Sequence, residues 1–140
     1  MRLYLDTTEW IYHFEGSDEF GQAATALIDR MDLGHHTAIS SIFVLSEILV
    51  VPRRAEDEFS IAKLRRFFLS PAVTLAPYNL AAMDLYTTLR AIHRVKPLDA
   101  LHLSIAATAG ADYFATNDTK LHKLTIAGIG RICTSTEALA

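Results

Sequence analysis

The chain has one cysteine and no long hydrophobic run, and each shortage excludes a class of protein. Cys133 is the only thiol in 140 residues, so an internal disulfide and a thiolate-based zinc site are both excluded. Near the N-terminus, Asp6 stands where a signal peptide needs its apolar stretch. Longer apolar runs are interrupted by Ser46, Glu47 or Pro52 and fall well short of the ~20 residues that cross a membrane. We therefore expect a cytoplasmic protein with no membrane partner.

Positive charge and glycine-rich loops are also scarce. The 13 Lys and Arg residues face 16 Asp and Glu residues, a formal net charge of −3, which argues against binding nucleic acid through bulk positive charge. A local basic face stays possible. The six glycines form no phosphate-binding loop, and there is no serine nucleophile elbow. The remaining question is what the acidic residues do.

Length and patterning predict one α/β domain spanning residues 1–140. The chain is 51% hydrophobic, and short strand-type runs alternate with amphipathic helical segments. The expected strands are 2–5, 35–40, 73–75, 113–115 and 130–134. The expected helices are 9–14, 17–33, 41–52 (ended by Pro52), 55–69, 79–95, 98–109 and 117–124, the last capped by Asn117. This alternation predicts a mostly parallel sheet of about five strands with helices on both faces.

Four acids occupy unusual positions in this pattern. Asp6 directly follows the first expected strand, Asp118 follows the fourth, and Asp99 lies in the first turn of the helix that Pro97 opens. Ligands of parallel sheets bind outside the carboxyl ends of the strands, where the chain order reverses. Glu47 lies in an otherwise apolar stretch, where an unpaired buried carboxylate costs several kcal/mol.

Each acid also has an ordinary structural explanation. Asp6 and Asp118 can cap helices, Asp99 can complement a helix dipole, and Glu47 can be exposed. All four explanations together require a coincidence of placement, so we favour a carboxylate cluster. Clustered carboxylates raise one another's pKa, and a divalent cation relieves this repulsion. Oxygen ligands favour Mg²⁺ or Mn²⁺, and one or two such ions, ~3.5–4 Å apart if paired, suit phosphodiester hydrolysis.

Four segments carry a resemblance to a known family. They are Leu5-Asp6-Thr7-Thr8, Leu45-Ser46-Glu47-Ile48-Leu49, PLDALHLSIA at 97–106 and ADYFATND at 111–118. In this order the sequence resembles PIN-domain ribonucleases, and more narrowly the VapC-type toxins of toxin–antitoxin pairs. The resemblance implies a PIN-like three-layer α/β/α sandwich that acts as a Mg²⁺- or Mn²⁺-dependent endoribonuclease on RNA.

The resemblance also implies roles and partners. Asp6, Glu47, Asp99 and Asp118 match the family's acidic quartet, and Thr7 and Thr116 match its supporting polar positions. Asp6 and Asp99 are expected as direct metal ligands, Asp118 as completing the metal or water shell, and Glu47 as orienting or deprotonating the attacking water. The implied partners are a cognate VapB-type antitoxin, received in the region of 53–69, and a second copy of the chain in a homodimer.

Alternatives remain at this point. The chain could be a non-catalytic PIN-like module that binds a protein partner, or a small-molecule phosphohydrolase, although Thr8 stands where the latter needs a second Asp. Asp99 and His102 lack a third partner in sequence for a zinc site, so we expect His102 to pack or hydrogen-bond near the acids. Basic residues that could contact RNA phosphates lie at Arg53-Arg54, Lys63-Arg65-Arg66 and Arg90-Arg94-Lys96.

Overall fold

A computed structural model of the chain describes residues 1–15, 19–32, 34 and 36–139. Its elements follow in the order β1 (Arg2–Leu5), α1 (Thr7–Glu15), α2 (Glu19–Asp32), β2 (Thr37–Ser40), α3 (Ile42–Ile48), α4 (Val50–Arg54), α5 (Glu58–Phe68), β3 (Val73–Leu75), α6 (Leu80–Ala91), α7 (Pro97–Thr108), β4 (Tyr113–Ala115), the 3₁₀ turn η1 (Leu121–Lys123), β5 (Arg131–Cys133) and α8 (Ser135–Leu139). The predicted strand at 35–40 and helix at 17–33 begin at residues outside the described ranges.

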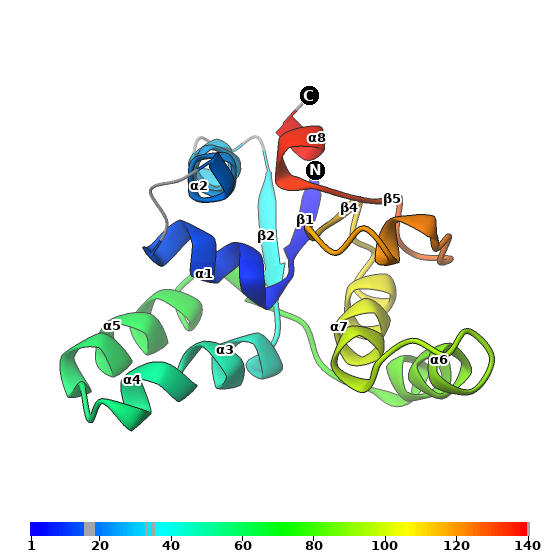
Figure 1. Ribbon diagram of the computed structural model, residues 1–140, viewed down its shortest axis with the longest axis horizontal. Coiled ribbons are helices and arrows are strands. Elements are labelled where there is room, and N and C mark those ends of the chain that lie inside the picture. The colour runs from blue at the N-terminus through cyan, green and yellow to red at the C-terminus, as the bar shows by residue number, and fades with distance from the viewer. Residues whose placement is uncertain (16–18, 33, 35, 140) are drawn as a thin grey trace.

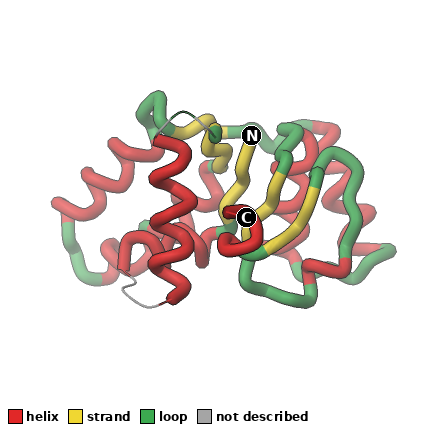
Figure 2. Tube along the Cα trace, turned by 90° about the horizontal axis from the view of Figure 1, so that it is seen from above, coloured by secondary structure: helices red, strands yellow, loops and turns green. Residues whose placement is uncertain are grey.

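The strands form one five-stranded sheet in the order β3-β2-β1-β4-β5, and every neighbouring pair is parallel. Helices α1 and α2 lie on one side of the sheet and α6 and α7 on the other (Figure 1). Viewed from above, the strands run between two groups of helices (Figure 2). The predicted three-layer α/β/α sandwich is confirmed.

Several predicted helix boundaries in the first half of the chain were wrong. The first helix begins at Thr7 instead of residue 9, because the Asp6 carbonyl oxygen already accepts hydrogen bonds from the next turn. Pro52 does not end a helix: α3 ends before Leu49, and Pro52 lies in the first turn of α4, where its missing N–H has no intrahelical partner. Helix α5 begins at Glu58, since Asp57 caps it by accepting from the Ser60 N–H.

Two helices in the second half also differ from the prediction. The Asn79 cap is present, but α6 ends at Ala91 instead of residue 95, and Arg94 has a positive φ of 55° in the turn that follows. Asn117 caps no helix; between β4 and β5 the chain forms only the 3₁₀ turn η1. The sequence-based prediction also missed α8, whose five residues are too few to show a helical period.

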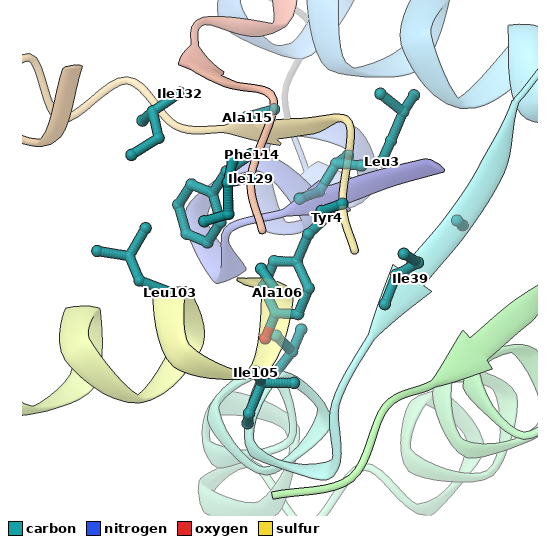
Figure 3. Close-up of a cluster of buried hydrophobic side chains, with 14 of the residues drawn as sticks. Leu3, Tyr4, Ile39, Leu103, Ile105, Ala106, Phe114, Ala115, Ile129 and Ile132 are labelled. Atoms are coloured by element: carbon teal, nitrogen blue, oxygen red, sulfur yellow. The ribbon is translucent and has the colours of Figure 1, made fainter. Parts of the chain in front are cut away.

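The central strand β1 lies in the core, and its carboxyl end leads directly to Asp6. Leu3, Tyr4 and Leu5 are fully buried, because helices cover both faces of the sheet. Figure 3 shows Tyr4 among apolar side chains that include Ile105 and Phe114, with its hydroxyl oxygen pointing away from β1. Within the described residues, no helix is long and apolar enough to cross a membrane.

Candidate functional site

The carboxyl ends of β1 and β4 lie side by side, and they bring Asp6 and Thr116 together. Leu5 pairs with Ala115 in the sheet, and the Asp6 N–H donates to the Ala115 carbonyl at 3.0 Å. The Thr116 hydroxyl then donates to Asp6 Oδ2 at 3.0 Å, while the Thr7 N–H donates to Oδ1 at 2.7 Å. The strand order reverses between β1 and β4, so this is the topological switch point of the sheet.

Glu47 joins this group from α3. The Thr7 hydroxyl donates to Glu47 Oε1 at 3.0 Å, and His102 Nε2 lies 2.5 Å from the same oxygen. Burial raises the pKa of Glu47, but the hydrogen bonds from His102 and Thr7 outweigh it and hold that pKa below its usual range. Glu47 therefore has two polar partners, although its neighbours along the helix are apolar.

Asp99 and Asp118 complete the acidic group through charge instead of direct hydrogen bonds. Asp99 lies in the first turn of α7, and its pKa is raised first by burial and then by the negative charges of Asp6 and Asp118. Asp118 is exposed, and its backbone N–H donates to the Thr116 hydroxyl at 3.1 Å. Burial likewise raises the pKa of Asp6.

The donor set fits a hard divalent cation by its chemistry. Its members are carboxylates. The negative charges of Asp6 and Asp118 contribute to the raised pKa of Asp99, and a bound cation would relieve this repulsion. Among the described residues, no three Asp, Glu, His or Cys side chains already converge as a metal-binding group. The structure therefore brings the predicted acids to one edge of the sheet without drawing them together as ligands.

Sequence reasoning placed His102 near the acids, which is confirmed, but it missed Tyr4. The Tyr4 hydroxyl lies 2.7 Å from His102 Nδ1 and 3.0 Å from the Ser41 hydroxyl. One available signal was the strand period: Tyr4 lies two residues before Asp6 and so faces the same side of β1.

Fold and site together define an α/β sandwich protein with acidic residues at the carboxyl ends of its central parallel strands. The chain belongs to the PIN domain family, whose family model matches residues 3–127. A comparison with curated proteins found no match.

Solved structures share the fold at low sequence identity. One is VapBC2 from Rickettsia felis bound to a DNA fragment from its promoter, with a TM-score of 0.69 at 18% identity over 95% of this chain and 97% of that one. Another is Mycobacterium tuberculosis VapC20, described as a Sarcin-Ricin loop cleaving toxin, with a TM-score of 0.65 at 15% identity over 88% of this chain and 96% of that one.

Proposed function

We propose that this chain is a VapC-type toxin that hydrolyses phosphodiester bonds of RNA. The observation that carries the proposal is the placement of Asp6 and Glu47, each held by a threonine hydroxyl, at the switch point of a PIN-domain sheet. The similarity in fold to VapC20, a toxin that cleaves the Sarcin-Ricin loop, supports an RNA substrate. A ribonuclease also accounts for the four acids better than separate helix caps do.

Asp6, Glu47, Asp99 and Asp118 would hold Mg²⁺ or Mn²⁺, the ions that all-oxygen donor sets favour. Bound there, the ion supplies Lewis acid chemistry: it polarises phosphate oxygens and lowers the pKa of water. Thr7 and Thr116 support the site, because their hydroxyls fix the carboxylates of Glu47 and Asp6. Metal dependence is part of the proposal, in line with the general use of divalent ions by PIN-domain nucleases.

Glu47 is suited to orient or deprotonate the attacking water. Both hydrogen bonds that the described residues make to its carboxylate go to Oε1, so Oε2 is the oxygen left for water. The lowered pKa keeps the group ionised at neutral pH, as an acceptor of the water proton must be.

The function is tested by incubating the purified protein with total cellular RNA and either Mg²⁺ or Mn²⁺, with EDTA as the control. We expect cleavage that requires the metal and stops with EDTA. Turnover of a small phosphate ester without RNA cleavage would favour a phosphohydrolase. No cleavage with either metal, together with tight binding of an antitoxin, would favour a non-catalytic binding module.

A groove beside the site supports a VapB-type antitoxin as the partner. Its volume is about 460 Å³, and it lies between α1, α3, α4 and α5. The lining is mainly apolar and reaches Glu47; it includes Ile11, Phe14, Ile48, Val51, Leu64 and Phe67. The groove thus includes part of the 53–69 segment predicted to receive the antitoxin. The homodimer and the cytoplasmic location stay predictions from the resemblance and the composition.

Val51→Glu is expected to weaken antitoxin binding at least about tenfold, since a charge would be buried in the groove at a cost of more than about 1.4 kcal/mol. Val51 lines the groove yet is 62% exposed, so the free chain tolerates the change. The matched control is Phe59→Glu, because Phe59 is 79% exposed and does not line the groove. The measurement is calorimetry with the product of the neighbouring reading frame, which the proposed function predicts to be the antitoxin. Equal affinities for both variants would contradict this docking site.

A further inference from the structure

A chain of hydrogen bonds links the buried core to Glu47. It begins at the Ser41 hydroxyl, which lies 3.0 Å from the Tyr4 hydroxyl and also caps α3 by accepting from the Val44 N–H. The Tyr4 hydroxyl lies 2.7 Å from His102 Nδ1, and His102 Nε2 lies 2.5 Å from Glu47 Oε1. This series of hydrogen bonds therefore connects β1, α3 and α7. These elements carry or precede Asp6, Glu47 and Asp99.

The proton positions in this chain follow from the donors available. The Glu47 carboxylate can only accept, so His102 Nε2 carries the hydrogen. Nδ1 of a neutral ring then accepts, and the Tyr4 hydroxyl is its donor. The Ser41 hydroxyl in turn donates to the Tyr4 oxygen. Each hydroxyl and ring nitrogen has a partner, and only one histidine tautomer fits.

The burial of these groups shows that the arrangement is built into the fold. His102 is 2% exposed and Tyr4 is fully buried, with its ring stacked on Phe114 at 5.3 Å between centroids. Burying polar groups is unfavourable unless each has a partner, and an apolar side chain would fill the same space without that requirement. A histidine at this position can hydrogen-bond a carboxylate, which an apolar residue cannot do, and the carboxylate that it contacts is Glu47.

We propose that His102 is a positioning residue for Glu47, with its ring fixed by Tyr4 and Ser41. The ring and Thr7 both engage Oε1, which fixes the rotation of the carboxylate and turns Oε2 toward the attacking water. Removing the ring donor would let the carboxylate rotate. The inference rests on the proposed ribonuclease function, because it assigns His102 a part in the same site.

The first test compares two variants of similar size. His102→Leu removes the donor, and we expect kcat for RNA cleavage to fall about 10- to 100-fold, the usual effect of losing an outer partner of a site carboxylate, with KM changed less than about twofold. His102→Gln keeps a side-chain N–H and is expected to recover at least about tenfold of that loss. Thermal melting establishes that both variants fold. Equal activity of the Leu and Gln variants, or a folded Leu variant as active as wild type, overturns the proposal.

A second measurement does not depend on activity. Nitrogen-15 NMR of the imidazole rings distinguishes the two tautomers, and the His102 signal is assigned by its loss in His102→Gln. We expect the Nε2–H tautomer in wild type and a mixture of tautomers in Glu47→Leu, which lacks the acceptor for the Nε2 hydrogen, because the Tyr4 hydroxyl can pair with either form of Nδ1. If wild type cleaves no RNA, the proposed function fails, but this NMR result still tests whether His102 donates a hydrogen bond to Glu47. A tautomer mixture in wild type overturns it.

Discussion

Asp6→Asn is expected to lower RNA cleavage by about a thousandfold, because metal-ion catalysis contributes several kcal/mol and about 1.4 kcal/mol is a factor of ten in rate. Asp6 lies at the centre of the proposed site: it hydrogen-bonds Thr7 and Thr116, and its charge raises the pKa of Asp99. Asparagine keeps the shape but removes the charge that would hold the cation. The measurement is the cleavage rate at saturating Mg²⁺ or Mn²⁺.

The same variant is expected to be at least as stable as wild type in EDTA at pH 8. Burial raises the pKa of Asp6, so the folded state binds a proton more readily than the unfolded state. The ionised group therefore destabilises the fold above the raised pKa, and this cost disappears as the pH falls through it. Melting curves at pH 8 and pH 5 should show an advantage of Asp6→Asn that shrinks in acid.

Asp112→Asn is the matched control for both measurements. Asp112 is an exposed acid that precedes β4 and accepts from the Arg2 N–H, at the end of the strand opposite to Thr116 and the acidic group. Its replacement should leave cleavage unchanged. Near wild-type cleavage by Asp6→Asn would contradict the proposed metal site, and a lower melting temperature at pH 8 would contradict the assigned cost of burying the Asp6 charge.

Gly128→Ala is expected to have the largest effect on stability, a loss of about 3 kcal/mol from backbone strain and overpacking combined. Gly128 has a φ of +98°, which disfavours any side chain. An added Cβ would also lie 2.4 Å from the carbonyl oxygen of Ala107, near the end of α7. That contact is with backbone, so no side-chain rotation relieves it. Chemical denaturation measures the free energy of unfolding.

Gly110→Ala separates the two causes. Gly110 has a similar φ of +71°, but nothing lies within 4 Å of an added Cβ. This control should lose only about 1 kcal/mol, the cost of strain alone. If both variants lost the same free energy of unfolding, the close approach of Gly128 to α7 would not matter for stability.

The pattern of residues along the chain was enough to predict the fold class and where the acids stand. The strands at 2–5, 73–75 and 113–115 have the predicted bounds, because short apolar runs between breakers form buried parallel strands. Asp6 and Thr116 follow two of these strands directly. Since the carboxyl ends of parallel strands meet at one edge of a sheet, the proximity of these two residues follows from the sequence pattern.

Only the tertiary structure decided what the acids contact. Tyr4 and His102 are 98 positions apart and Glu47 and His102 are 55 apart, so no local spacing signals their hydrogen bonds. The groove likewise arises only in the folded chain, because its lining residues come from α1, α3, α4 and α5. Periodicity reports which face of a segment is buried, whereas partners and groove shape arise when distant segments pack together.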